Sequence, residues 1–407
     1  MENTKKFGLL GKTLRHSYSK TIHGLLGDYP YELYEKEEGQ IKDVFNTLDG
    51  FNVTIPYKTE VIKYIDCLSD GAKKIGAVNT VCKKDGKTYG FNTDADGMKY
   101  MIESKNISLK DKVVMILGSG GTSKTAEYCA KSLGAKKVLF VSRNGEINYQ
   151  NYHLQKDVQI VINTTPVGMF PNNYSCPINL SVFEDLQGVI DVVYNPNLTL
   201  LCFEAEKLNV PNVNGLKMLV AQAKFAKDIF FDSTTSNDKI EEIYHKILKE
   251  KLNVFLIGMP GSGKSTIGKA LAEKLGREFL DTDNLIENKA GKTIPEIFKE
   301  SGEEYFRELE TEVLKEVGAQ TGKVVATGGG VVTKDRNLYP LRSNGVCVYI
   351  KRDLDSLSKD GRPLSKSDTA VKELYEKRKN LYTAFSQISV SNDGEISSTV
   401  DKIMELL

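Results

Sequence analysis

Two glycine-rich turns with different sequence patterns most strongly constrain what this chain can fold into. Each turn follows an apolar run typical of a buried strand and precedes a run typical of a helix. The first turn reads GSGGTSK from Gly118, and the second reads GMPGSGKST from Gly258. Glycines at the start of a helix let backbone N–H groups approach a phosphate closely. The sequence therefore predicts two separate nucleotide sites, and two enzymes in one polypeptide.

The second turn fits the phosphate-binding pattern G-x-x-x-x-G-K-[ST] and follows a predicted strand at residues 253–257. We expect Lys264 to bridge the β and γ phosphates of ATP and the Ser265 hydroxyl to hold Mg²⁺. The alternative is a turn that only starts a helix, but the strand, the lysine and the serine together favour a kinase or another NTPase. The residues expected to contact the nucleotide are Gly261, Ser262, Gly263, Lys264, Ser265 and Thr266.

The first turn gives G-x-G-x-x-S after a predicted strand at residues 112–117, which is typical of a dinucleotide-binding fold. The next predicted strand, 138–141, is followed by Arg143, where NAD-binding folds carry an acidic residue for the ribose. A positive charge attracts a 2′-phosphate, so the pattern predicts NADP rather than NAD. The simpler alternative is a surface arginine after a strand. The residues expected at this cofactor are Gly118, Ser119, Gly120, Gly121, Thr122, Ser142, Arg143 and Asn144.

The overall composition argues against strongly charged partners. The 407 residues carry 55 Lys and Arg against 54 Asp and Glu, which predicts small-molecule substrates and neither nucleic acid nor membrane as a partner. The 6 cysteines have no C-x-x-C spacing, so we expect reduced, mostly buried thiols. No apolar run reaches the roughly 20 residues of a membrane span, and no signal core begins the sequence, so we expect a soluble, cytoplasmic protein.

Strand-like and helix-like runs alternate along the whole chain, which indicates an α/β protein with parallel sheets covered by helices. A polar turn at residues 231–238, followed by an amphipathic run at 239–252, marks the best boundary. We predict a substrate domain built from residues 1–97 with 213–250, a Rossmann-like dinucleotide domain at 98–212, and a P-loop kinase domain at 252–407.

The first part of the chain resembles shikimate dehydrogenase through a series of ordered segments. They are HSYSK (16–20), FNVTIPYK (51–58), GAVNTV (76–81), GFNTDADG (90–97), NTTPVGM (163–169), DVVYNP (191–196) and NGLKMLVAQA (214–223). The resemblance covers residues 1 to about 250. It implies NADPH-dependent reduction of 3-dehydroshikimate to shikimate, in a cleft between the two dehydrogenase domains.

The resemblance also implies a catalytic pair, Lys58 and Asp94. Hydride reduction of a ketone leaves a developing alkoxide, which a neighbouring ammonium stabilises and protonates. Taken alone, Lys58 is a surface lysine and Asp94 an N-cap of the next helix. The remaining positions implied for the substrate have hydroxyl or amide side chains, and two backbone positions are implied beside the nicotinamide. They are Ser17, Ser19, Thr54, Asn79, Tyr194 and Gln222 for the substrate, with Val192 and Gly215 for the cofactor.

Gln222 is unusual without any reference to the family. On a helix it shares a stripe with Met218, Phe225 and Ile229, so an amide interrupts an apolar face. Buried amides need hydrogen-bond partners. A ligand hydroxyl and a backbone carbonyl both remain open as that partner.

The dehydrogenase part departs from the family at several points. Between Arg143 and Asn163 it is shorter by about one helix, so we expect the cofactor domain to lack an element. Lys20 replaces the usual proline after the serines, and Lys124 replaces a common arginine in the helix of the glycine loop.

Residues 252–407 resemble shikimate kinase. The matching segments are LDTD (280–283), 294–298, GEEYFRELE (302–310), TGGG (327–330), GRPL (361–364) and 378–382. Asp281 and Asp283 end a predicted strand, at the edge where open α/β sheets bind ligands. The family implies that Asp281 backs the Mg²⁺ held by Ser265, and that Asp283 orients or deprotonates the accepting hydroxyl. A solvated acidic turn is the alternative.

The family further implies a carboxylate site from Arg307, Gly329 and Arg378, and a lid residue, Arg362, that closes over the γ-phosphoryl. Arg307 is also one helical step from Glu303 and Glu310, so a surface ladder of ion pairs is an alternative. The lid is short, and Lys359 or Asp360 stands where the family often has an adenine-stacking arginine.

Two classes of function compete. The first is a bifunctional shikimate-pathway enzyme that uses NADP(H), ATP and Mg²⁺. The second is a non-catalytic sensor with the same folds, but the predicted catalytic groups are all present in the sequence. A variant of the enzyme hypothesis makes the first part a quinate dehydrogenase. The sequence leaves the oligomeric state open.

Overall fold

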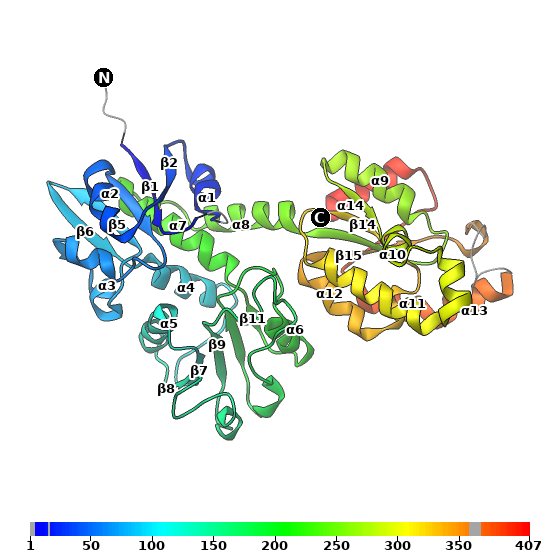
Figure 1. Cartoon of the computed structure of the whole chain (residues 1–407), viewed down its shortest axis with the longest axis horizontal. Helices are drawn as coiled ribbons and strands as arrows, with labels where there is room; N and C mark the ends of the chain where they lie inside the picture. The colour runs from blue at the N-terminus through cyan, green and yellow to red at the C-terminus, as the bar shows by residue number, and fades with distance from the viewer. Residues whose placement is uncertain (1–4, 15–16, 358–367) are drawn as a thin grey trace. The chain divides into compact units, whose positions relative to one another are not determined.

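The computed structural model describes residues 5–14, 17–357 and 368–407. The chain forms two compact units (Figure 1). One comprises Met1–Tyr194 with Thr199–Ile247, and the other comprises Asn195–Leu198 with Leu248–Leu407. Each unit is an α/β structure, as the alternation of strand-like and helix-like runs predicts.

The first sheet of the N-terminal unit has six strands in the order β2-β1-β3-β5-β6-β4. The strands are β1 (Phe7–Gly11), β2 (Tyr31–Glu35), β3 (Gly50–Val53), β4 (Cys67–Leu68), β5 (Thr80–Lys84) and β6 (Lys87–Phe91). β1 pairs in parallel with β2 and β3, whereas β5 runs antiparallel to β3 and β6. This mixed sheet carries the turns after β1, β3 and β6, whose residues line a cavity of the unit.

The helices α1 (Ser19–Leu26), α2 (Ile41–Thr47), α3 (Asp70–Ile75) and α7 (Leu216–Phe231) belong to the same part of the unit. The helix α4 (Thr93–Glu103) leads from β6 to the second sheet and packs along α7. Met98, Met101 and Ile102 of α4 are fully buried in a core shared with strands of the second sheet. After the second sheet is complete, α7 therefore returns to the elements around the first sheet.

The second sheet has five parallel strands in the order β11-β10-β9-β7-β8. They are β7 (Val113–Leu117), β8 (Lys137–Val141), β9 (Ile160–Asn163), β10 (Gly188–Asp191) and β11 (Asn212–Val213), with helices α5 (Gly121–Ser132) and α6 (Leu200–Lys207). All five residues of β7 are buried, as expected for a central strand with both faces covered. The predicted strands 112–117 and 138–141 are confirmed to within one residue.

No α-helix lies between β8 and β9, a segment that is described throughout. The connection holds only the 3₁₀ helix Tyr152–Leu154. Half-buried Ile147, Tyr149 and Tyr152 pack there against a core that includes residues of β7, β8 and β9. The absence of an α-helix from this connection is consistent with the shortening noted in the sequence.

The C-terminal unit has five parallel strands in the order β13-β14-β12-β15-β16. The strands are β12 (Asn253–Ile257), β13 (Phe279–Asp281), β14 (Val324–Ala326), β15 (Gly345–Lys351) and β16 (Ile388–Ser391). The helices are α9 (Lys264–Leu275), α10 (Thr282–Ala290), α11 (Ile294–Gly318), α12 (Leu338–Ser343), α13 (Asp368–Phe385) and α14 (Ile396–Leu406). β12 matches its predicted bounds.

Helices cover both faces of this sheet (Figure 1). One core joins the sheet to α10, α11, α12 and α13, and a second core joins it to α9 and α14. In α11, Gly302 has φ 81° and interrupts the helix. The GEEYFRELE segment therefore begins a new helical piece with its own direction.

The helix α8 (Asp238–Lys251) precedes β12 and confirms the amphipathic run that the sequence predicts. Its buried side chains Ile240, Ile243 and Ile247 recur at helical spacing. Within the described residues, none of the helices has the length and apolar character to cross a membrane.

Candidate active sites

A cavity of about 460 Å³ in the N-terminal unit collects side chains from four parts of the fold. Its walls come from the segment before α1, the turn after β3, the start of α4, and α7, together with residues beside the second sheet. It is lined by every side chain predicted to contact the dehydrogenase substrate, namely Ser17, Ser19, Thr54, Lys58, Asn79, Asp94, Tyr194 and Gln222. His16 of the HSYSK segment lies outside the described residues.

Lys58 and Asp94 form an ion pair in this cavity. The Nζ of Lys58 donates to the Oδ2 of Asp94 at 2.6 Å, and the two side chains are 30% and 17% exposed. Asp94 is not the N-cap of α4, because Asn92 holds that position and accepts from the backbone N–H of Ala95. The carboxylate is therefore available to orient the ammonium inside the cleft.

Asn79 sits in a buried polar network that the sequence alone did not reveal. Its Oδ1 accepts from the backbone N–H of Thr93 at 2.7 Å, and its Nδ2 donates to the Thr93 hydroxyl at 3.1 Å. Asn52 donates to the Thr80 hydroxyl at 3.0 Å, and that hydroxyl lies 3.0 Å from the Thr93 hydroxyl. Because these groups are buried, the network fixes which way the two amides face.

Gln222 faces the cavity but also has a backbone partner. Its Nε2 donates to the carbonyl of Leu219 at 3.0 Å. Of the two partners left open by the sequence, the backbone carbonyl is therefore present, and the ligand hydroxyl stays a prediction. The predicted apolar stripe is only partly buried, because Phe225 and Ile229 are half-buried and line a different cavity.

The glycine-rich turn after β7 leaves room for a pyrophosphate. Gly118 has φ 112°, and Gly120 is the N-cap of α5. A Cβ at Gly120 or Gly121 would meet no atom within 4 Å, so backbone N–H groups at the helix start face open space. Ser123, where a dinucleotide-binding fold usually has Gly or Ala, turns its hydroxyl inward to the carbonyl of Gly120 at 2.6 Å. The turn therefore fits a dinucleotide.

The other cofactor residues lie at the carboxyl ends of β8 and β10. Arg143 and Asn144 are exposed immediately beyond β8. Val192 follows β10 and lines the cleft with Gly215, whose missing Cβ would collide with the carbonyl of Val192. The close approach of these two backbone segments explains why glycine occupies position 215.

Asp191 holds the segment that follows β10. It accepts from Asn163 Nδ2 at 2.9 Å, Val193 N at 3.0 Å and Thr199 Oγ1 at 2.8 Å. Burial raises the pKa of this carboxyl to about 7, although the three donors oppose the change. Through its hydrogen bond with the backbone N–H of Val193, Asp191 thus fixes the backbone next to Val192.

A second cavity, of about 490 Å³, lies over the phosphate-binding loop of the C-terminal unit. The predicted residues that line it are Gly261, Gly263, Lys264, Ser265, Thr266, Asp281, Asp283, Arg307, Gly329 and Arg378. Ser262 is fully buried beneath the loop. Arg362, Lys359 and Asp360 lie outside the described residues.

The loop has the geometry of a phosphate cradle. Gly258, Gly261 and Gly263 have φ of 147°, 84° and 89°, values that only glycine adopts without strain. The Nζ of Lys264 donates to the carbonyls of Gly258 and Met259, both at 2.9 Å. The ammonium is therefore held across the loop.

The residues predicted to hold Mg²⁺ are in contact. The Ser265 hydroxyl donates to Asp281 Oδ2 at 2.8 Å. Asp281 ends β13 and caps α10, whereas Asp283 lies in the first turn of α10 and not at the end of a strand, as the sequence reading placed it. A hydroxyl and a carboxylate oxygen fit Mg²⁺, which usually keeps several waters and phosphate oxygens. Among the described residues, no group of three or more His, Cys, Asp or Glu side chains is placed to hold a metal ion.

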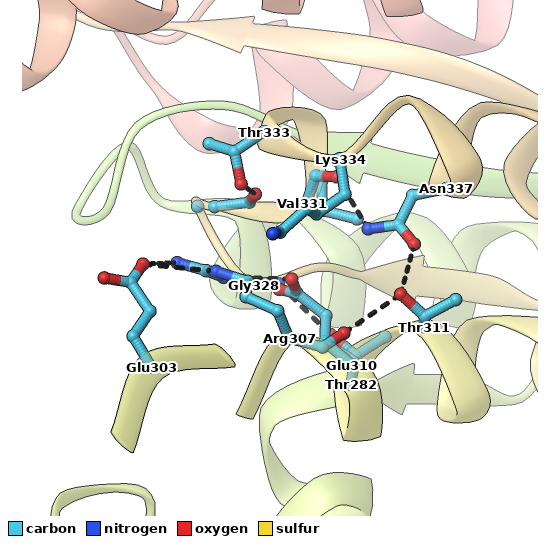
Figure 2. A network of polar contacts seen from close by, with 12 residues as sticks. Thr282, Glu303, Arg307, Glu310, Thr311, Gly328, Val331, Thr333, Lys334 and Asn337 are labelled. Atoms are coloured by element: carbon cyan, nitrogen blue, oxygen red, sulfur yellow. Dashed lines mark hydrogen bonds and ion pairs between the residues drawn. The ribbon is translucent and has the colours of Figure 1, made fainter. Parts of the chain in front are cut away.

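Arg307 is not part of a surface ladder, because its side chain is only 5% exposed. Its guanidinium donates to Glu303 at 3.0 Å and to the fully buried Glu310 at 2.9 Å (Figure 2). A Cβ at Gly330 would collide with the guanidinium, so the planar group lies against the glycine backbone. The arrangement fixes the orientation of the guanidinium, a planar group of the kind that can bind a carboxylate through two N–H groups.

Glu310 and Asp283 each keep a buried oxygen, Oε1 and Oδ1, without a hydrogen-bond partner in the described part of the chain. The two oxygens lie 2.9 Å and 2.8 Å from the position of a Cβ at Gly328. Burial raises the pKa of Glu310 to about 7 and raises that of Asp283 above its ordinary range. The sequence reading treated Glu310 only as a partner in a surface ladder.

The glycine turn between β14 and residue 331 joins the elements of this site. Gly329 O accepts from Arg378 Nη1 at 3.0 Å and from the Tyr382 hydroxyl at 2.5 Å. Gly328 N donates to the Thr282 hydroxyl at 3.1 Å. Tyr382 and Thr282 were missed as site residues because their contacts cross between distant segments.

Asn337 fastens the far end of the same turn (Figure 2). It donates to Val331 O at 2.9 Å and accepts from the Thr311 hydroxyl of α11 at 2.8 Å. The turn and the helix that carries Arg307 are therefore tied together by buried hydrogen bonds.

The comparisons with known proteins agree with both family resemblances. Residues 9–81 match the family model described as shikimate dehydrogenase substrate binding domain, and residues 260–407 match the one described as shikimate kinase. The chain is 34% identical to a shikimate dehydrogenase (NADP(+)) of Clostridium beijerinckii over 259 residues, which cover 58% of this chain and 96% of the relative.

Solved structures resemble the N-terminal unit. A chorismate mutase/shikimate 5-dehydrogenase fusion protein from Clostridium acetobutylicum has a TM-score of 0.58 at 34% identity, covering 61% of this chain and 98% of its own. A shikimate 5-dehydrogenase from Thermus thermophilus, in complex with NADP(H) and shikimate, has a TM-score of 0.54 at 25% identity and covers 60% and 99%. The chain therefore belongs to the shikimate dehydrogenase family through its N-terminal part and carries a shikimate kinase domain in its C-terminal part.

Proposed function

We propose that the chain catalyses two consecutive reactions. The first is the NADPH-dependent reduction of 3-dehydroshikimate to shikimate, and the second is the ATP-dependent phosphorylation of shikimate to shikimate 3-phosphate. We assign reduction to a substrate domain of residues 1–97 with 213–250 and an NADP domain of residues 98–212, and phosphorylation to residues 252–407. The ion pair of Lys58 and Asp94 inside the cleft carries the first assignment.

In the reduction, the bound nicotinamide supplies the hydride, and the protein supplies charge stabilisation and a proton. The Lys58 ammonium is placed to stabilise the oxyanion that forms at the reacting carbon and to hand it a proton. Asp94 holds the ammonium at 2.6 Å and limits the positions that it can occupy. The product is an alcohol, and Lys58 then regains its proton from solvent.

The hydroxyls and carboxylate of the substrate match the other side chains of the cleft. Ser17, Ser19 and Thr54 supply small hydroxyl groups, and Asn79 and Gln222 supply amides. The buried network behind Asn79 keeps its amide in one orientation. Support for NADP as the cofactor comes from Arg143 beyond β8 and from the NADP(+)-linked relatives.

In the phosphoryl transfer, Ser265 and Asp281 would hold Mg²⁺, which would supply charge neutralisation to the phosphates. Lys264 and the loop N–H groups hold the phosphates. Asp283 orients the accepting hydroxyl for attack on the γ-phosphorus and receives its proton. Arg307 and Arg378 bind the shikimate carboxylate beside the Gly329 turn.

The experiment that tests both assignments is a pair of separate assays on the purified full-length chain. NADPH oxidation with 3-dehydroshikimate and ATP consumption with shikimate should each show substrate-dependent turnover. A sensor with the same folds would bind these metabolites without turnover. NADP⁺ reduction with quinate at a rate equal to that with shikimate would instead favour the quinate/shikimate dehydrogenase variant.

A further inference from the structure

We propose that Tyr18 is a positioning residue for the reduction, because its ring holds the two walls of the dehydrogenase cleft together through a contact with Tyr194. This inference rests on the proposed function and adds a residue to it. Tyr18 lies between Ser17 and Ser19 in the HSYSK segment, and nothing in that position of the sequence indicates a distant partner.

The two tyrosine rings are in contact across the cleft. Their centroids are 6.0 Å apart and their planes meet at 80°, which is an edge-to-face arrangement. This separation lies within the roughly 4.5–7 Å of interacting aromatic pairs, so no substrate fits between the rings. Both residues line the cavity of about 460 Å³, a volume within the roughly 300–1,000 Å³ of small-ligand sites. The contact therefore closes part of the cavity wall and leaves room for a ligand inside.

The backbone of Tyr18 is fixed on the side of the first sheet. Tyr18 is the N-cap of α1, and its carbonyl accepts from the backbone N–H of Ile22 at 2.9 Å. Ile22 is fully buried, and α1 packs against α7 and β2. The ring of Tyr18 therefore moves away from its partner only if its side chain rotates or α1 shifts.

The backbone beside Tyr194 is fixed on the side of the second sheet. The N–H of the preceding residue, Val193, donates to Asp191 Oδ1 at 3.0 Å, and its carbonyl accepts from Gly215 N at 3.1 Å. Asp191 itself ends β10. Because the two rings are carried by different sheets, their contact resists separation of the two walls.

Separation of the walls would weaken substrate binding. The cofactor side of the cleft carries Val192 and Gly215, and the substrate side carries Lys58. A ligand that touches both sides binds best when they are close, and a contact that favours the close arrangement raises its affinity. An edge-to-face pair contributes modestly, so its loss should change the affinity about two- to tenfold.

The test is steady-state reduction of 3-dehydroshikimate by NADPH on the full-length chain. Tyr18→Ala should raise KM for 3-dehydroshikimate about two- to tenfold and leave kcat within about twofold, because the bound ligands themselves bridge the walls at saturation. Tyr18→Phe keeps the ring and should behave as wild type. Thr21→Ala, at an exposed position of α1, is the matched control and should also behave as wild type.

A double-mutant cycle assigns the effect to the ring contact. In a Tyr194→Ala background, the further change Tyr18→Ala should raise KM by less than about twofold, because the partner ring is already absent. Additive effects would overturn the proposal, since Tyr18 would then act without Tyr194.

Unchanged KM in Tyr18→Ala would overturn the proposal outright, and a Tyr18→Phe variant as impaired as Tyr18→Ala would assign the effect to the hydroxyl instead of the ring. Thermal unfolding shows whether each variant is folded. If Tyr18→Ala unfolds, Tyr18→Leu, which keeps apolar bulk without a ring, carries the same expectation. Wild-type chain without NADPH-dependent reduction would remove the proposed function itself, which is a separate result.

Discussion

The Nζ of Lys58 lies 2.6 Å from Oδ2 of Asp94, although the residues are 36 positions apart in the sequence. Lys58 follows β3, and Asp94 starts the helix after β6. The strands β3, β5 and β6 are neighbours in one sheet, so their connections meet at the cleft. The two side chains are exposed enough to contact a ligand. They are also buried enough that water screens their charges less than it would on an open surface.

Replacement of Lys58 tests its chemical role. Lys58→Ala should lower kcat of the reduction by roughly 10² or more while substrate affinity changes little, because a group that acts mainly in the transition state is lost. Steady-state kinetics and a direct binding titration measure the two quantities. Lys63→Ala, which removes an exposed lysine paired with Glu60, is the control. Near-normal turnover in Lys58→Ala would remove the assigned role.

Arg143 should decide the choice of cofactor. Arg143→Ala is expected to weaken NADPH binding by about 1.5–3 kcal/mol, the scale of a charge-assisted hydrogen bond, and to leave NADH binding nearly unchanged. Fluorescence titration with both cofactors measures this difference. Lys137→Ala, at the opposite end of β8, serves as the control. Equal losses for NADPH and NADH would mean that Arg143 is structural.

Because of the buried Glu310 carboxyl, we expect the stability of α11 to depend on pH. Burial raises the pKa of its carboxyl in the folded state to about 7, above the ordinary 4.5. The folded state therefore binds this proton more tightly, and the stabilisation is full below pH 4.5 and disappears as the pH rises through 7. Between pH 5 and pH 8, the free energy of the opening that exposes α11 to exchange should fall in wild type. In Glu310→Gln it should fall by up to about 3 kcal/mol less.

Hydrogen exchange of α11 peptides in the full-length chain, corrected for the intrinsic exchange rate, measures that protection. Glu303→Gln is the matched control, because Glu303 also binds Arg307 but its side chain is 52% exposed. It should follow the wild-type pH dependence. A Glu310→Gln profile as steep as that of wild type would contradict the prediction.

The two candidate sites were predicted from different signals, the phosphate-binding loop from its spacing and the dehydrogenase side chains from the resemblance to a known family. The residues of the phosphate-binding loop act within a few positions of one another, so spacing alone identifies them. The strands 112–117, 138–141 and 253–257 could be read from apolar runs beside glycine turns. The missing helix after β8 could be anticipated from length alone.

Burial and long-range contacts could not be read in this way. Glu303, Arg307 and Glu310 have the spacing of a surface ladder, but Arg307 packs against Gly330, which is distant in sequence. Asn337 looks like any loop amide until the fold brings it to Thr311. Helical periodicity placed Gln222 on an apolar stripe, whereas the cleft itself interrupts the packing there.

The central claim is that one chain performs both reactions at separate sites. The most direct test supplies 3-dehydroshikimate, NADPH, ATP and Mg²⁺ to purified full-length protein and follows shikimate and shikimate 3-phosphate. Wild type should form shikimate 3-phosphate. Lys264→Ala, which removes the ammonium held across the phosphate-binding loop, should accumulate shikimate while NADPH oxidation stays within about twofold of wild type. Collapse of the reduction in a folded Lys264→Ala variant, or continued formation of shikimate 3-phosphate by it, would contradict the account.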